Sequence, residues 1–213
     1  MTPRRPPDPI EEVLGALEQI LGTRPTDSQE QLFGQYLELF GRWNRVHRMT
    51  ALGTPTAIVR DLFIDSLLFL RVLPPQRPLA VVDIGAGAGI PGLPMRLADP
   101  RLTICLVESK RKRVSFLRTV CRELGLDDVA VIEGRAEQIH LLNTDLEGAF
   151  DVAVSRAVAR MDRISPIALP YLKVGGAVIV ATAPDTPASP GAELIRVAVP
   201  GSARRRGFLM LTK

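Results

Sequence analysis

The chain is poor in the residues from which disulfide frameworks and metal sites are built. Its 213 residues include only two cysteines and two histidines. Cys105 and Cys121 both stand within apolar patterns, which favours buried free thiols in a reducing compartment over a disulfide. His47 and His140 cannot by themselves assemble a zinc-type cluster. We therefore expect no bound metal ion.

Long apolar runs are also missing. No stretch reaches the roughly 18 consecutive apolar residues that mark a membrane-spanning helix. The N-terminus reads Met-Thr-Pro-Arg-Arg-Pro-Pro and lacks the apolar core of a secretory signal. We expect residues 1–8 to be disordered, and the protein to be a cytoplasmic monomer with no membrane partner.

A large excess of either charge is absent as well. Lys and Arg total 27 against 23 for Asp and Glu, and the pI is about 9.5. This mildly basic balance permits a nucleic-acid partner without requiring one. The hydrophobic content of 46% is that of an ordinary globular protein. The length suits one α/β domain with a modest extension.

Apolar residues at helical spacing dominate the first third of the chain. Phe33, Tyr36, Phe40 and Trp43 follow this spacing, which favours a buried helix face over a platform for stacking nucleic-acid bases. Residues 9–75 are expected to form a small helical extension. Its predicted helices cover residues 9–21, 26–43 and 55–73.

From Leu79 onward, strand and helix patterns alternate, which predicts a parallel sheet. Residues 76–213 are expected to form this sheet domain, in one compact unit with the extension. Strands are predicted at 79–84, 101–107, 129–132, 150–154, 177–181, 194–199 and 208–212. Helices are predicted at 90–97, 110–124 and 164–172, and a proline-rich loop at 182–191.

A glycine-rich segment after the first strand is the strongest local signal. Residues 81–92 read Val-Val-Asp-Ile-Gly-Ala-Gly-Ala-Gly-Ile-Pro-Gly, the strand–turn–helix pattern with which open α/β sheets hold nucleotide-like ligands. The last six residues match the dinucleotide fingerprint G-x-G-x-x-G. A pyrophosphate, however, needs free N–H donors and no nearby anion. Asp83 supplies an anion and Pro91 removes a donor, which favours S-adenosylmethionine, whose ammonium and sulfonium groups are cationic. A turn without a ligand is the alternative.

Four further features stand at predicted strand ends or on the helix after the second strand. Glu108 lies 23 positions beyond Gly85 and can bind ribose hydroxyls or be a surface carboxylate. Residues 134–137, Gly-Arg-Ala-Glu, border the cofactor edge or form a plain turn. Arg156 meets the methyl acceptor or is a solvated charge. The basic run at 110–113 contacts phosphates or is a solvated helix face. A second cluster, the three arginines at 204–206, is predicted to be an exposed hairpin turn.

These segments, in this order, resemble the bacterial 16S ribosomal RNA guanine-N7 methyltransferases of the glucose-inhibited division protein B type. The resemblance runs from about Leu32 to about Ala181. The matching segments are Trp43-Asn44, Thr50-Ala51, Phe63-Ile64-Asp65-Ser66-Leu67, residues 83–94, Lys112-Arg113-Val114, Arg135-Ala136-Glu137 and Ser155-Arg156-Ala157.

The resemblance implies a Rossmann-like class I S-adenosylmethionine-dependent methyltransferase sheet with a small N-terminal helical extension. It implies methyl transfer to N7 of a guanine in 16S rRNA of the small ribosomal subunit, at guanine 527 in the family. Lys112, Arg135 and Arg156 would position the substrate without a general base. The expected cofactor-binding residues are Asp83, Gly85, Gly87, Gly89, Ile90, Glu108, Ala136, Glu137 and Arg156.

The chain departs from the family pattern at several positions. Arg48 and Met49 stand where Asn-Leu is usual, Leu62 stands where a histidine is usual, and Thr182 replaces a lysine expected near the acceptor. Two alternatives therefore stay open: a methyltransferase for a small molecule or protein, and a non-catalytic member that binds S-adenosylmethionine or RNA. A nicotinamide enzyme is disfavoured by Asp83 and Pro91.

Overall fold

The computed structural model describes residues 8–75, 78–156 and 160–213. Residues 1–7, most of the segment predicted to be disordered, lie outside the described residues. Asp8 is described and caps the first helix, because its side chain accepts a hydrogen bond of 2.8 Å from the Ile10 N–H. None of the helices within the described ranges is long and apolar enough to cross a membrane.

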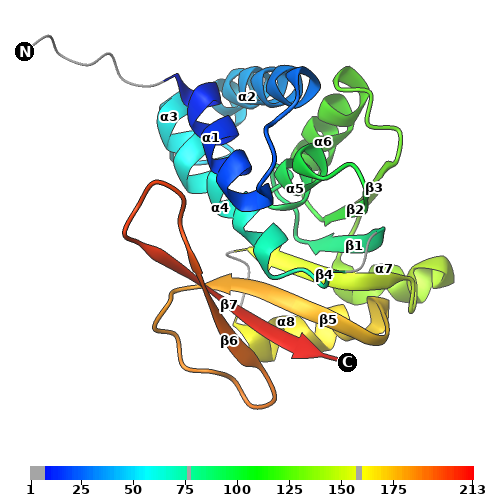
Figure 1. The fold of residues 1–213 in the computed structure, drawn as a ribbon. Helices are drawn as coiled ribbons and strands as arrows, with labels where there is room; N and C mark the ends of the chain where they lie inside the picture. The colour runs from blue at the N-terminus through cyan, green and yellow to red at the C-terminus, as the bar shows by residue number, and fades with distance from the viewer. Residues whose placement is uncertain (1–7, 76–77, 157–159) are drawn as a thin grey trace, which may run out of the picture.

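A seven-stranded sheet forms the centre of the molecule (Figure 1). The strand order is β3-β2-β1-β4-β5-β7-β6, with β1 to β5 parallel and the last two antiparallel. The predicted alternation and parallel pairing are thus confirmed. The strands are β1 Leu79–Ile84, β2 Leu102–Glu108, β3 Val129–Glu133, β4 Phe150–Arg156, β5 Leu172–Thr182, β6 Glu193–Ala198 and β7 Arg205–Thr212.

Helices cover both faces of this sheet. On one face lie α1 Pro9–Leu21, α2 Asp27–His47, α5 Gly92–Ala98 and α6 Arg111–Glu123, with α7 Ala136–Leu142 and α8 Met161–Ala168 on the other (Figure 1). The third predicted helix is a continuous helical path whose hydrogen-bond pattern changes along its length. Its parts are α3 Pro55–Ile58, the π-helical η1 Val59–Ile64, α4 Asp65–Leu67 and the 3-10 helix η2 Leu68–Arg71.

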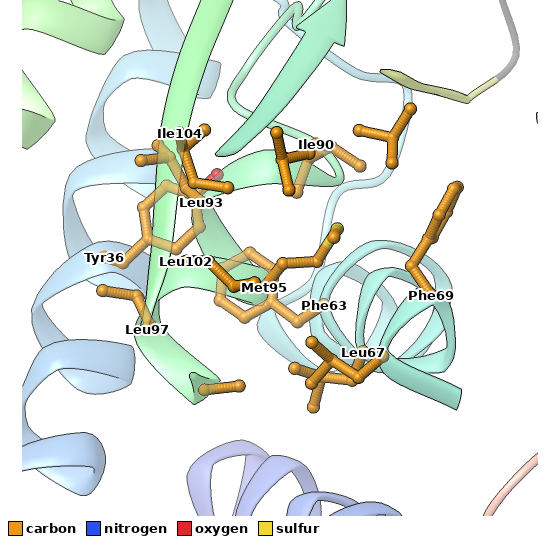
Figure 2. Close-up of a cluster of buried hydrophobic side chains, with 14 of the residues drawn as sticks. Tyr36, Phe63, Leu67, Phe69, Ile90, Leu93, Met95, Leu97, Leu102 and Ile104 are labelled. Carbon is orange, nitrogen blue, oxygen red and sulfur yellow. The ribbon is translucent and has the colours of Figure 1, made fainter. Parts of the chain in front are cut away.

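The N-terminal helices pack directly onto the helix that follows the glycine turn (Figure 2). The rings of Tyr36 and Phe63 stack with centroids 4.7 Å apart, and the Tyr36 hydroxyl donates a 2.5 Å hydrogen bond to the Ala88 carbonyl. Phe33, Tyr36 and Phe40 are fully buried, which confirms that they form a core face. The helical extension therefore packs against the glycine turn and α5 and holds the turn in place.

Several predicted boundaries are wrong, and the largest differences in the sheet domain concern β5, α8 and β7. Strand β5 begins at Leu172 instead of 177, because Leu172 pairs with Phe150 and the strand continues to Ala177 across a shift in register, where Gly175 has a φ of +79°. The helix predicted at 164–172 lies earlier, as α8 and a 3-10 turn at Leu169–Tyr171. The turn before β7 lies at 199–204, where Val199 N donates to Arg204 O, so Arg205 and Arg206 belong to the strand.

Candidate functional site

The glycine turn joins the carboxyl end of β1 to α5. The N–H groups of Gly85 and Ala86 both donate to the Val107 carbonyl, at 2.9 and 3.0 Å, so the turn is attached to the end of β2. Helix α5 begins at Gly92, two residues later than predicted, with Pro91 directly before it. The turn therefore lies at the edge of the sheet where open α/β folds bind ligands.

Close packing explains why glycines stand at positions 89 and 92. Gly89 has a φ of +84°, and a Cβ atom there would lie 2.3 Å from Leu93 Cδ1. A Cβ atom on Gly92 would lie 2.7 Å from Leu106 Cδ2 and 2.9 Å from Asp83 Oδ2. Gly92 thus lets α5 approach the sheet, and Gly89 lets the turn pack against Leu93 of α5.

Asp83 lies beneath the turn and not at its surface. Its side chain is fully buried, and Oδ2 accepts a 2.9 Å hydrogen bond from Gly92 N. Oδ1 has no hydrogen-bond partner in the described part of the chain. Burial raises the pKa of Asp83 to about 7, the nearby charge of Glu108 adds to this, and the hydrogen bond from Gly92 opposes it. Contact between Asp83 and a bound cofactor stays a prediction.

The raised pKa of Asp83 predicts a stability that falls as the pH rises. Between pH about 4 and 7 the folded protein keeps a proton that the unfolded chain has released, so this group's stabilising contribution is lost across that window. In the wild type, Asp83 should lower the free energy of unfolding by about 2–4 kcal/mol across this window. Asp83→Asn keeps the acceptor for Gly92 N but does not titrate, so it should not show this decrease. Urea denaturation at several pH values measures it. The exposed Asp127→Asn is the control, and equal slopes for Asp83→Asn and wild type would contradict the expectation.

Glu108 closes the turn from the side of β2. Its Oε2 accepts a hydrogen bond from Gly87 N at 2.9 Å and lies 3.6 Å from Arg113 Nη1, while Oε1 accepts one from Lys110 N at 2.7 Å. The residue is 4% exposed, so it is not a surface carboxylate. The structure thus brings Gly87 and Glu108 together as predicted. Because a carboxylate offers about four acceptor positions, it can still accept from ribose hydroxyls.

The segment after β3 reaches the same edge. Gly134 N donates to the Glu108 carbonyl at 3.0 Å. Arg135 is exposed at the N-terminus of α7, and Glu137 is exposed on its first turn. Ala136 is buried, and its carbonyl accepts a 2.6 Å hydrogen bond from the Tyr171 hydroxyl. Sequence reasoning missed α7 and predicted only a turn or a cofactor-binding edge at residues 134–137.

Arg156 ends β4 and contacts the N-terminal helical path. Its Nε donates to Asp65 Oδ2 at 2.7 Å, and its Nη2 donates to the Asp61 carbonyl. Arg206 Nε lies 3.1 Å from Asp65 Oδ1, so one carboxylate faces two guanidinium groups. The predicted exposed turn at 204–206 is therefore wrong for Arg206, and Arg205 is exposed but lies on β7. Ala157, the last residue of the predicted motif, lies outside the described residues.

The predicted basic residues lie along the same edge but do not meet. The strand order places Arg135 and Lys112 on the β2–β3 side of the glycine turn and Arg156 on the β4 side (Figure 1). No ion pair or hydrogen bond joins these three side chains. Lys112 and Arg135 are exposed. The three cations therefore flank the predicted cofactor position.

Neither cysteine takes part in this arrangement. Cys105 and Cys121 are free and buried, as predicted. Burial raises the pKa of the Cys105 thiol to about 12 and that of Cys121 to about 11. Among the residues that the structure describes, no three His, Cys, Asp or Glu side chains form a group that could hold a metal ion. The chemistry of the edge therefore rests on carboxylates, backbone groups and basic side chains.

Comparison with known proteins gives consistent matches. The family model described as GidB, rRNA small subunit methyltransferase G, matches residues 29–185. The ribosomal RNA small subunit methyltransferase G of Streptococcus sanguinis is 38% identical over 167 residues, 78% of this chain and 70% of the relative. That of Streptococcus equi subsp. zooepidemicus is 38% identical over 165 residues, 77% and 69% of the two chains.

Solved structures agree on the fold. A SAM-dependent methyltransferase from Aquifex aeolicus superposes with a TM-score of 0.54 at 15% identity, covering 77% of this chain and 97% of that chain. A protein from Agrobacterium tumefaciens, described as a predicted O-methyltransferase, gives a TM-score of 0.54 at 16% identity over 71% and 79% of the two chains. The sheet is therefore of the class I methyltransferase type.

Proposed function

Since this chain belongs to the family of rRNA small subunit methyltransferase G proteins, we propose which of its residues perform the family's reaction. That reaction is the transfer of a methyl group from S-adenosylmethionine to N7 of a guanine in 16S rRNA of the small ribosomal subunit. The contact between the glycine turn and Glu108 carries the proposal. We further propose that the protein acts as a monomer in the cytoplasm, where its ribosomal substrate is.

The glycine turn and Glu108 fit an adenosine-containing cofactor. A Cβ atom placed on Gly87 would meet nothing closer than 3.8 Å, so a ligand can approach the backbone there. Glu108 is held against Gly87 with acceptor positions left for the two ribose hydroxyls. Gly85, Gly89 and Ile90 shape this turn, with Asp83 as the buried carboxylate under it.

Ala136 and Glu137 would border the adenine from the β3 side. Ala136 is held in place by the hydrogen bond from Tyr171, so its backbone has a defined position. Glu137 stands on the first turn of α7. The basic side chain of Arg135 immediately precedes both residues, which places a cation between the cofactor edge and solvent.

Guanine N7 holds its lone pair in the plane of the ring and carries no proton. Its methylation therefore needs no general base, and positioning is the main requirement. A bound S-adenosylmethionine supplies the methyl group on its sulfonium. Arg156 would orient the guanine, since an arginine can donate to guanine O6. Arg135 would assist from the other side, and Lys112 would bind the RNA backbone.

Thr182 marks the main departure from the family pattern. Its hydroxyl forms a 2.6 Å hydrogen bond with the Thr186 hydroxyl, so it ties the proline-rich loop to the end of β5. The loop lies over a cavity of about 630 Å³ next to Val180 and Leu209. A neutral hydroxyl cannot supply the positive charge of the lysine expected near the acceptor, so the proposal relies on the charges of Lys112, Arg135 and Arg156.

Labelled S-adenosylmethionine and unmodified small ribosomal subunits test the proposed function. We expect label in 16S rRNA, at N7 of one guanine, when the RNA is digested and mapped. Label in a protein or small molecule instead would support a different acceptor. Cofactor binding by calorimetry without any label would support a non-catalytic member.

A further inference from the structure

A cavity with basic walls lies between the end of α2 and the start of α6. It has a volume of about 320 Å³ and is lined by residues 47–49 and 110–113. Five of these seven residues are Lys or Arg, a sixth is His47, and none is acidic. The two lining segments are separated by some sixty residues in sequence, and both contribute basic residues to the wall of this cavity.

The cations around this cavity are largely uncompensated. In the described ranges, the side chains of Arg48, Lys110, Arg111 and Lys112 form no ion pair or hydrogen bond. Arg113 forms one ion pair among these described residues, with Glu108 at 3.6 Å. Like charges at this spacing repel one another, and the N-terminus of α6 adds its positive partial charge without any acidic residue in its first turn. A bound anion would relieve this repulsion.

Arg48 enters the cavity from a backbone position that does not suit arginine. Its φ is +48°, and it is the one residue other than glycine, over the described stretches, in the left-handed region. The conformation is imposed by its neighbours. Arg48 N donates to Asn44 O, and the Asn44 side chain bonds Thr50 N and Leu52 O on the returning chain. Asparagine or glycine would adopt this conformation at lower cost.

The cavity adjoins the proposed cofactor site. Lys110 N donates to one oxygen of Glu108, and Arg113 lies against the other. An anion in the cavity would therefore contact residues that themselves touch Glu108, the carboxylate proposed to bind the cofactor ribose. An RNA substrate offers such an anion in the phosphate next to its target nucleotide.

We propose that this cavity binds a backbone phosphate of the RNA substrate and that Arg48 completes its wall. The proposal rests on the proposed function for the identity of the anion. It adds His47 and Arg48, on the N-terminal helical extension, to the RNA-binding surface. Arg48 stands where the family pattern has asparagine, so this contact would be a property of this chain.

Arg48→Asn tests the proposal because it should weaken RNA binding and at the same time stabilise the fold. Loss of one phosphate contact should make the plot of log affinity against log salt less steep by about 0.7. The same loss corresponds to binding of small ribosomal subunits that is about eightfold weaker at about 50 mM salt. Relief of the left-handed arginine should raise Tm by about 2–4 °C. Filter binding over a salt series and thermal denaturation measure the two effects.

Two further variants separate charge from conformation. Arg48→Lys keeps the cation and the unfavourable backbone, so binding should stay within about twofold of wild type. Arg24→Asn removes the same charge at the other end of α2, about 30 Å away along a 21-residue helix, and should change neither measurement. An unchanged salt slope for Arg48→Asn, or an equal loss for Arg24→Asn, would overturn the proposal. These binding measurements do not depend on methyl transfer, so they stay interpretable if the proposed function fails.

Discussion

Replacing Arg156 with alanine should lower methyl transfer to the small ribosomal subunit by about 10²-fold, while the affinity for S-adenosylmethionine changes far less. The reason is that Arg156 is proposed to hold the guanine in line with the methyl group, and loss of such orientation costs about this factor. Single-turnover transfer and calorimetric binding of the cofactor measure the two quantities. Unchanged turnover would rule the assignment out.

The contacts of Arg156 require a control for structural damage. The side chain is 18% exposed and paired with Asp65, which is 15% exposed and also faces Arg206. Asp65→Asn removes the carboxylate but keeps Arg156. If Arg156 acts on the substrate, Asp65→Asn should lose much less activity than Arg156→Ala. Equal losses in the two variants, with equal losses of stability, would show that Arg156 only ties β4 to the helical extension.

Arg156→Lys separates charge from hydrogen-bond geometry. Lysine keeps the positive charge but lacks the planar pair of donors that can address guanine O6 and a carboxylate together. We expect transfer rates between those of wild type and Arg156→Ala. A lysine variant as fast as wild type would indicate that only the charge matters at this position.

Gly89→Ala should destabilise the protein by about 2–5 kcal/mol and abolish cofactor binding. A non-glycine residue at a φ of +84° costs about 1–2 kcal/mol. Forcing a Cβ atom to within 2.3 Å of Leu93 Cδ1 adds about 1–3 kcal/mol of overpacking. Leu93 is fully buried, so shifting its side chain would disturb the packing of the core around it. Urea denaturation and calorimetry with S-adenosylmethionine measure the two effects.

Gly87→Ala provides the matched control for this substitution. Gly87 also has a positive φ, of +61°, but its added Cβ would meet nothing closer than 3.8 Å. It should therefore show the backbone cost alone, about 1–2 kcal/mol. Removing the obstacle with Leu93→Ala should recover part of the loss of Gly89→Ala, seen as a coupling energy in a double-mutant cycle. Equal destabilisation by Gly87→Ala and Gly89→Ala would contradict the packing argument.

Much of the sheet was predictable because its strands are covered on both faces. Such strands appear as short continuous apolar runs, and β1 has the predicted limits of 79–84. The glycine turn and the acid at the end of β2 were also predictable from local pattern, and their contact follows from parallel neighbours in the sheet. The turn before β7 was misplaced, since arginines continue from the turn into the start of β7, where Arg205 and Arg206 pair with β6 alone.

The orientation of Asp83 shows what local pattern leaves open. Alternation along β1 puts Asp83 and Ile84 on opposite faces, but both faces of the sheet are buried. Nothing in the sequence tells which face carries α5. In the structure the carboxylate points under the turn to Gly92 N, which makes it a buried support of the turn.

The sequence by itself determined the succession of strands along the chain, the glycine turn and the type of ligand that the turn favours, because these features are local patterns of neighbouring residues. The tertiary structure decided which distant side chains meet. Arg156 and Asp65 are 91 residues apart in sequence, and Arg48 shares a cavity with Lys112. Such contacts depend on how the helical extension packs on the sheet, and that packing is set by many buried side chains together.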